Sequence, residues 1–234
     1  RIVGISAYTE RPEKAREVKP VVSAFIGGSV KKIKELDPDL VIGFSDVQAG
    51  LARDLIKENL QVLITNQRSL DDILDVLLMV GRLVGAEKRA QSLVDGYRER
   101  IRRIRKEREK RDRSPKVYFE EWDDPMISGI QWVSELIEIA GGENIFADRA
   151  EEPASKNRET TAEEVIERAP DIYISCWCGK PLDEAAVRKR EGFDAIPAIR
   201  NNRIYEMDPA IILQPGPASL TDGLDRLCDI MDEL

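Results

Sequence analysis

The sequence of 234 residues contains no histidine, and this absence excludes several classes of enzyme. Histidine is the commonest general base and the commonest protein ligand for metal ions. Zinc hydrolases, Ser-His-Asp hydrolases and Cys-His proteases are therefore excluded. A glycine-rich phosphate loop is also missing, since Gly27-Gly28 lacks both the required spacing and a Lys-Ser/Thr partner. We expect a protein that is not an enzyme and that has no metal site or cofactor.

Cysteine is scarce, and the three residues Cys176, Cys178 and Cys228 cannot all be paired. Cys176 and Cys178 flank Trp177 at an expected strand end, where metal or redox use stands as an alternative to small buried side chains. No apolar run is long enough to span a membrane, and the net charge of −8 argues against a nucleic-acid partner. The chain begins abruptly in an expected strand at Arg1, so we expect residues to precede it and infer nothing about a signal peptide or lipid anchor.

Strands and helices alternate along the chain. Residues 40–44 form an unbroken apolar run of the kind found in buried parallel strands, directly after the turn Asp37-Pro38-Asp39. A similar turn, Ala169-Pro170-Asp171, precedes the apolar run 172–176 in the other half. Short turns of this type between strands and helices favour βαβ units. We predict an α/β fold with mainly parallel sheets in two Rossmann-like lobes.

A long charged segment, 87–113, separates the two halves. Its apolar residues make one narrow helical stripe at spacings of four, four and three: Leu93, Tyr97, Ile101 and Ile104. Ser114-Pro115 ends the segment. We predict an N-terminal lobe at 1–85, a connecting helix at 86–113 and a C-terminal lobe at 114–234. A long surface helix inside a single domain is the alternative.

Hydroxyl side chains mark several expected helix starts. Ser29 and Ser69 each precede an amphipathic segment, and Thr161 with Glu164 has the spacing of a capping box. We expect helices to begin directly after Ser29 and Ser69, and a third helix to begin at Thr160 or Thr161.

Aromatic residues make up only 6% of the chain, yet five of them stand where an expected strand ends. They are Tyr8, Phe25, Phe44, Trp122 and Trp177. In parallel α/β sheets, ligands bind beyond the carboxyl ends of the strands, and aromatic walls suit a large planar ligand. We predict that these residues line a ligand site, with polar contacts from Ser128 and Gly129. The alternative is that each aromatic residue covers the end of its own sheet.

Acidic pairs at Glu120-Glu121 and Asp123-Asp124 offer a second interpretation of the same region. A two-lobed, nucleotide-sugar-dependent enzyme would use Asp123 and Asp124 as metal ligands. No partner base accompanies these carboxylates in the sequence, so a solvated loop is the simpler interpretation.

The run Glu135 to Phe146 resembles the signature of the helical-backbone substrate-binding proteins of ABC importers for cobalamin, siderophores and haem. Segments 4–8, 23–25 and 42–44 are similar to the first lobe of the vitamin B12-binding members, where aromatic residues at these places line the corrin site. The resemblance covers nearly the whole chain. It implies two lobes joined by a long helix, a ligand between them, an ABC permease as partner, and a location in the periplasm or anchored outside the cytoplasmic membrane.

The chain departs from this family pattern in two places. The family's first strand-helix unit is absent before the Arg1 strand, and a position near 31 that docks onto permease arginines through an acidic residue is Lys31 here. Glu35, one turn further on, and Glu191 in the other lobe are the docking candidates.

The ligand is expected to be a corrinoid, which presents a broad apolar face and a rim of amides. Ferric siderophores are usually anionic and favour several basic residues, whereas Arg11 and Lys180 are the nearest ones here. Haem usually takes an axial histidine, although Tyr8 or a cysteine would serve. Siderophore and haem binding remain the alternatives.

Overall fold

The computed structural model describes residues 2–111 and 113–233, and the chain divides into two compact units between Gln67 and Arg68. Both units are α/β with mainly parallel strands, as the sequence predicts. The division differs from the predicted one, which placed residues 68–85 in the first lobe and treated 86–113 as a separate connection. Within the described residues, every helix is too short or too polar to cross a membrane.

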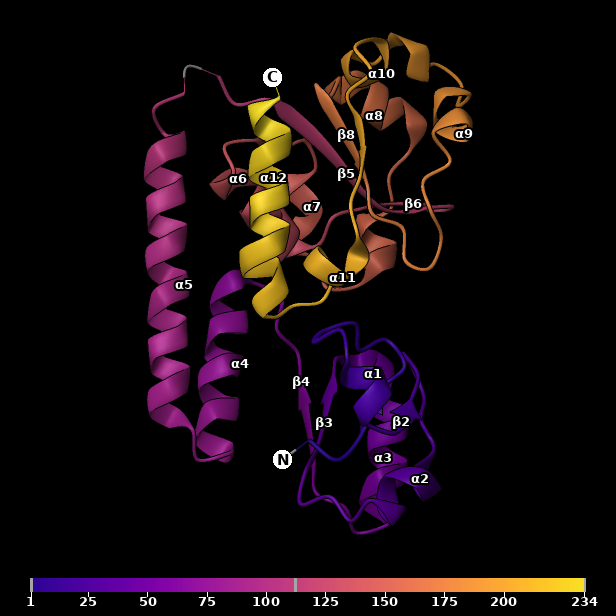
Figure 1. Ribbon diagram of the computed structural model, residues 1–234. Coiled ribbons are helices and arrows are strands. Elements are labelled where there is room, and N and C mark those ends of the chain that lie inside the picture. Colours follow the sequence, from indigo (N-terminus) through magenta and orange to yellow (C-terminus); the bar gives the residue numbers. More distant parts are fainter. Residues whose placement is uncertain (1, 112, 234) are drawn as a thin grey trace. The chain divides into compact units, whose positions relative to one another are not determined.

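The first unit contains two parallel strand pairs (Figure 1). β1 (Ile5–Ser6) pairs with β2 (Val21–Ser23), and β3 (Val41–Phe44) pairs with β4 (Val62–Thr65). The helical segments are α1 (Ala15–Val18), α2 (Val30–Glu35), the 3-10 turn η1 (Asp46–Gln48) and α3 (Ala49–Lys57). Ser29 caps α2 by accepting a hydrogen bond from Lys32 N, as predicted.

The first strand is shorter than predicted. The strand expected from Arg1 onward forms only at Ile5–Ser6 within the described residues, with a shift of the pairing register between these two residues; Arg1 lies outside the described part. The small core of this unit is built from the inner faces of its helices, where Ile33 and Leu55 are buried.

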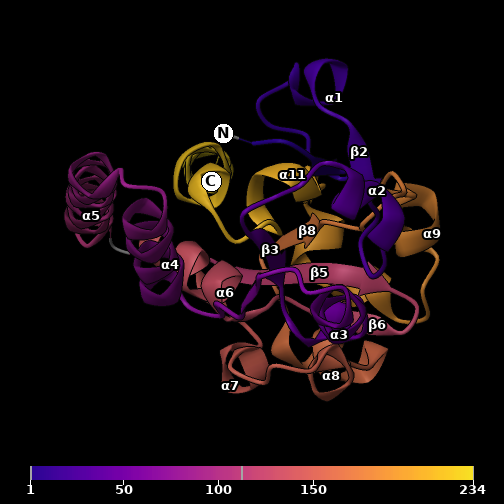
Figure 2. The same cartoon turned by 90° about the horizontal axis from the view of Figure 1, so that it is seen from below.

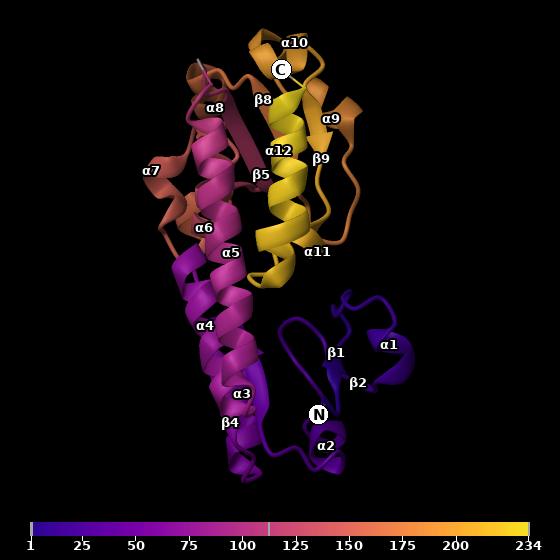
Figure 3. The ribbon, with the colours of Figure 1, turned by 60° about the vertical axis from the view of Figure 1, so that its left-hand side comes forward.

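The second unit begins with a helical hairpin (Figure 3). α4 (Leu70–Leu83) is capped by Ser69 in a capping box with Asp72, and α5 (Glu87–Arg108) follows it after a short turn. Gly81 lets the helices approach closely, since a Cβ there would lie 2.2 Å from the Cβ of Ala90. The long helix therefore forms as expected, but it ends at Arg108 and not at 113; residue 112 lies outside the described part.

Polar contacts explain why this hairpin belongs to the second unit. Glu135 of α6 (Gln131–Ile139) accepts a hydrogen bond from Leu70 N at 2.7 Å, which fixes the start of α4. Arg100 and Arg108 of α5 form ion pairs with Asp225 and Asp232 of α12 (Leu224–Asp232). These contacts tie both helices to the sheet that follows. The function of α5 as a connection between lobes stays a prediction.

A five-stranded sheet forms the centre of the second unit. Its central strand β5 (Lys116–Asp123) pairs in parallel with β7 (Glu143–Asn144) near its start and with β8 (Ile172–Ser175) along its middle. β6 (Met126–Ser128) pairs antiparallel with the end of β5, and β9 (Ile204–Glu206) pairs in parallel with β8. The acidic pairs that were interpreted as a solvated loop therefore lie in and beside a hairpin, because β5 continues to Asp123 and turns back into β6.

Helices cover both faces of this sheet, with α12 and α8 (Ala162–Arg168) on opposite sides of β5 (Figure 2). Side chains alternate between the two faces of a sheet along each strand. On one face, Tyr118 of β5 packs among Val165 of α8 and neighbouring residues. On the other face, Phe119 lies close to Gly129 and Val117 lies close to Gly142, so that a Cβ at either glycine would contact the strand residue. The remaining helical segments are α7 (Ala147–Ala150), η2 (Ser155–Arg158), α9 (Glu184–Arg188), η3 (Phe193–Ala195), α10 (Pro197–Arg200), α11 (Pro209–Ile212) and the π-helical turn η4 (Ser219–Gly223).

Candidate functional site

The aromatic residues predicted in the first unit form a small exposed group. Tyr8 and Phe25 are each 56% exposed, and their rings meet edge to face with centroids 6.0 Å apart. Phe44 stands half-buried at the end of β3. Gln48 joins the two segments, because its Nε2 donates to the Phe25 carbonyl at 2.7 Å and its Oε1 accepts from Phe44 N at 2.9 Å. This amide bridge joins the backbone at Phe25 to the backbone at the end of β3.

The two tryptophans of the second unit lie at different depths. Trp122, at the end of β5, is half-buried, whereas Trp177 is only 4% exposed and belongs to the core beside Tyr118 and Tyr173. The ammonium of Lys180 lies over both rings, 4.5 Å from the Trp122 centroid and 5.2 Å from that of Trp177. Trp122 and Lys180 therefore supply the accessible surface here, and Trp177 lies behind them. The prediction that Trp177 forms an open wall is not met by this burial.

The indole of Trp177 is held by a buried carboxylate that the sequence did not single out for this function. Glu120 has no exposed surface and accepts hydrogen bonds from Trp177 Nε1 at 3.1 Å, from Tyr173 at 2.5 Å and from Tyr118 at 3.0 Å. Arg190 adds two more, at 2.6 and 2.9 Å, as a bidentate ion pair. Glu120 thus joins four side chains, those of Tyr118, Tyr173, Trp177 and Arg190, in one hydrogen-bonded cluster.

The ionisation of the groups around Glu120 follows from this geometry. Burial, followed by the nearby Glu120 charge, raises the pKa of Tyr118 and of Tyr173 well above the ordinary value, so both phenols stay protonated donors. Burial alone would lower the pKa of Arg190, but the hydrogen bonds and charge of Glu120 raise it overall. Arg190 is therefore a permanent cation.

Ser128 and Gly129 serve the interior of the unit. Ser128 has no exposed surface, and its Oγ donates to the Arg158 carbonyl at 3.1 Å. Arg158, whose side chain is 2% exposed, donates in turn to the Ser128 carbonyl and to Glu121, both at 2.6 Å. A Cβ at Gly129 would lie 3.1 Å from the Phe119 ring, so this glycine allows a close approach of strand and loop. Neither residue offers surface to a ligand, and we do not retain them as contacts.

The acidic run at the end of β5 is neutralised by distant cations. Glu120, Glu121 and Asp123 form ion pairs with Arg190, Arg158 and Lys180, in that order. Each cation comes from a loop or short helix more than 30 residues further along the chain. Across the described residues, no group of three or more His, Cys, Asp or Glu side chains is placed to hold a metal ion. Of the two aspartates considered as metal ligands, Asp123 forms an ion pair with Lys180 and Asp124 is exposed.

The three cysteines are unpaired thiols. Cys176 and Cys228 are buried, and Cys178 is exposed. Burial raises the pKa of all three, so they remain protonated near neutral pH. A protonated thiol is a poor nucleophile and a poor metal ligand, which favours the interpretation of Cys176 and Cys228 as packing residues.

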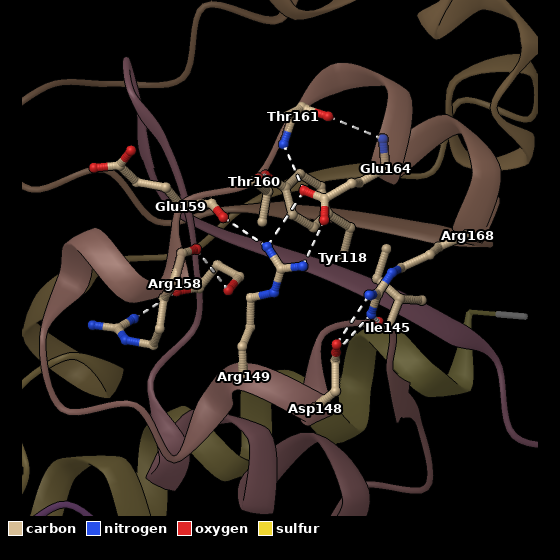
Figure 4. A network of polar contacts seen from close by, with 11 residues as sticks. Tyr118, Ile145, Asp148, Arg149, Arg158, Glu159, Thr160, Thr161, Glu164 and Arg168 are labelled. Carbon is tan, nitrogen blue, oxygen red and sulfur yellow. Dashed lines mark hydrogen bonds and ion pairs between the residues drawn. The ribbon is translucent and has the colours of Figure 1, made fainter.

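A network of polar contacts joins α7 to α8 (Figure 4). Arg149 donates to Glu164 at 2.6 Å and to the Glu159 carbonyl at 2.7 Å, while Arg168 donates to both carboxylate oxygens of Asp148, at 2.6 and 3.0 Å. Glu164 also completes the predicted capping box with its N-cap threonine. These contacts hold α7 against α8.

This network predicts how stability depends on pH. The Arg168 hydrogen bond lowers the pKa of Asp148, and the Arg149 hydrogen bond lowers that of Glu164. A carboxylate whose pKa is lower in the folded state than in the unfolded state stabilises the native state at pH values above its unfolded pKa, which is about 4. This stabilisation is lost as the pH falls below about 4 and through the folded pKa. We expect Asp148→Asn with Glu164→Gln to reduce the fall in the free energy of unfolding below this pH, measured by urea titration.

The matched control for that measurement is Glu151→Gln, which removes an exposed carboxylate from the same segment. Its unfolding profile should follow the wild-type curve. An unchanged pH dependence in the double variant would contradict the assignment of these two ion pairs.

The candidate docking residues are both exposed. Glu35 is at the end of α2 and approaches Lys31 at 3.9 Å, an i, i+4 pair of two well-solvated side chains. Glu191 follows α9. Such a surface pair is weak, so Glu35 is available to another cation. Their docking role stays a prediction.

Comparisons with known proteins agree on one family. A family model described as "Periplasmic binding protein" matches residues 1–211. A Bacillus subtilis protein named as an uncharacterized ABC transporter substrate-binding lipoprotein is 25% identical over 98% of this chain and 72% of its own length. A vitamin B12-binding protein of Vibrio parahaemolyticus is 22% identical over 98% of this chain and 81% of its own.

Solved structures share the fold. A possible iron-binding, periplasmic solute-binding protein from Staphylococcus epidermidis superposes with a TM-score of 0.81 at 25% identity, over 98% of this chain and 90% of that one. A haem complex of a Staphylococcus aureus protein gives a TM-score of 0.82 at 18% identity, over 98% and 91%. With a family match over most of its length, the chain belongs to the periplasmic binding protein family, whose members work outside the cytoplasmic membrane as the substrate-binding components of ABC importers and are not enzymes.

Proposed function

We propose that this protein delivers a corrinoid such as cobalamin to its ABC importer. The coarser function, substrate binding within the group that includes vitamin B12, haem and siderophore binding proteins, follows from its family. The finer proposal is carried by aromatic side chains with accessible ring faces in each of the two units. Tyr8, Phe25 and Phe44 of the first unit and Trp122 of the second present flat apolar faces at strand ends.

The chemistry of a corrin ring matches such a surface. Its faces are broad and apolar and its rim carries neutral amides, so stacking supplies most of the contact. Haem would need an axial ligand, and these 234 residues contain no histidine. Ferric siderophore or haem binding is therefore the second candidate. The cation available to such a ligand in the second unit is Lys180, which lies over the Trp122 ring.

Calorimetric titration tests the corrinoid proposal. We expect Phe44→Ala and Trp122→Ala each to weaken cobalamin binding by on the order of 1 kcal/mol or more, because each removes a stacking face. Leu93→Ala, which truncates an exposed apolar side chain on α5, is the matched control and should bind as wild type does. Wild-type protein that binds a ferric siderophore or haemin but neither cobalamin nor cobinamide would end the corrinoid proposal and leave the family unchanged.

Docking to the permease is tested separately by charge reversal. We expect Glu35→Lys and Glu191→Lys to leave ligand affinity unchanged and to reduce ligand uptake by cells that contain the importer, because acidic side chains are proposed to meet permease arginines. Glu151→Lys makes the same change at another exposed glutamate and should not affect uptake. Normal uptake by both docking variants would show that other residues contact the permease.

A further inference from the structure

We propose that Lys180 makes the site select ligands that carry an anionic group, such as a phosphodiester or carboxylate, on an otherwise apolar planar body. The inference deepens the proposed function and rests on it, because it assigns the tryptophan surface of the second unit to the ligand. Three features of this surface support the inference: fixed rings, a cation that lies above them, and a single carboxylate paired with that cation.

Both tryptophan rings are held in place through their N–H groups. Trp122 Nε1 donates to the Asp124 carbonyl at 2.9 Å, and Trp177 Nε1 donates to the buried Glu120 at 3.1 Å. Both indole N–H groups are occupied, that of Trp177 in the interior and that of Trp122 at the surface, so the ring faces are left to contact Lys180. The rings form a preorganised seat for a cation.

The ammonium of Lys180 occupies this seat. At 4.5 and 5.2 Å from the two ring centroids, it is within the range of a cation–π contact with each. Its only ion-pair partner among the described residues is Asp123. The Lys180 side chain remains 39% exposed, so a solvent-borne anion can reach the ammonium. A ligand that approaches these tryptophans meets a positive charge before it meets an indole face.

The position of this charge separates two kinds of ligand. An uncharged planar ligand must displace the ammonium from Trp122 to stack on that ring, and the ammonium then also loses its contact with the buried Trp177. A ligand with a phosphate or carboxylate leaves the ammonium over the rings and accepts from one of its three N–H donors beside Asp123, which adds a charge-assisted hydrogen bond. Selection for an anionic substituent follows from this difference.

Two pairs of probes differ in an anionic group. Cyanocobalamin carries a phosphodiester in its nucleotide loop, and dicyanocobinamide lacks the whole loop, so the effect of each variant is compared with wild type for both members. Haemin carries two carboxylates, and its dimethyl ester carries none. Within each pair the ring is the same, so a charge-specific function of Lys180 appears as a difference between the two members.

The experiment is calorimetric titration of the purified chain and three variants with these four probes. Lys180→Met removes the charge and keeps the length of the side chain. We expect it to weaken binding of the anionic member of a pair about tenfold and to leave the neutral member within about twofold, the range for a hydrogen bond to a charged group. Asp123→Asn removes the competing carboxylate and should strengthen anion binding about threefold. Lys156→Met, an exposed lysine elsewhere in this unit, should change nothing.

The outcomes separate this inference from the corrinoid proposal. Corrinoid binding that Lys180→Met weakens equally for both members, or not at all, would overturn the function of Lys180 and leave corrinoid binding intact. Charge-specific loss seen only with the haemin pair, while wild-type protein ignores both corrinoids, would support Lys180 and end the corrinoid proposal. Wild-type protein that binds none of the four probes would overturn both. Thermal melting of each variant confirms that it is folded.

Discussion

Glu120→Gln is expected to lower the free energy of unfolding by about 3 kcal/mol, because it leaves the charge of Arg190 without a partner inside the second unit. The Glu120 side chain has no exposed surface, and the Arg190 side chain is only 19% exposed. Glutamine is nearly isosteric with glutamate, so packing is preserved. Its amide nitrogen replaces an acceptor with a donor that faces other donors, which adds to the loss.

A double-mutant cycle with Arg190→Met, measured by urea unfolding, tests this expectation. The double variant should be less destabilised than the sum of the two single variants, since it removes both charges together. Glu143→Gln, at an exposed glutamate of β7, is the control and should stay within about 0.5 kcal/mol of wild type. A Glu120→Gln protein of wild-type stability would show that the carboxylate does not hold this cluster together.

Gly81→Ala is expected to cost about 2 kcal/mol of stability, the range for overpacking of a close contact. The new Cβ would lie 2.2 Å from the Cβ of Ala90, and the short side chain of alanine cannot move away. The α4–α5 hairpin would have to separate at this point. The cost of this steric clash therefore outweighs the gain of about 1 kcal/mol that alanine normally brings to a helix interior.

Gly96→Ala is the matched control for that variant. Gly96 lies inside α5, and a Cβ there would meet nothing within 4 Å. The same substitution should therefore raise the free energy of unfolding by up to about 1 kcal/mol, the gain in helix propensity from glycine to alanine. Urea or thermal unfolding of both variants checks the pair. A Gly81→Ala protein as stable as Gly96→Ala would contradict the tight crossing of α4 and α5.

Local sequence patterns predicted the elements and the class of fold. The run 40–44 became β3 after its Asp-Pro-Asp turn, and Ser29, Ser69 and Thr161 cap helices as their positions indicated. These features depend on neighbours within four residues, so the sequence displays them directly. The family followed in the same way from a contiguous motif before Phe146.

The division of the chain and the depth of its site residues were not predicted. A helical stripe on α5 says that one face is buried, but not that Arg100 and Arg108 pair with α12 more than 120 residues later. Likewise, a tryptophan after a strand looks the same in sequence at the surface as in the core. Trp122 is half-buried at the end of β5, whereas Trp177 is buried in the core cluster of the second unit.

The sequence by itself determined the α/β class, the helix caps and the family, since these are encoded in short windows or in recognisable motifs. Only the tertiary structure decided which cation meets which acid at the end of β5, and therefore that Glu120 fixes Trp177 while Asp123 holds Lys180 above the tryptophans. Such pairs join residues 57 positions apart. Their geometry depends on the register of β5 beside β8 and on the path of the loop after β8, neither of which leaves a periodic signal in the chain.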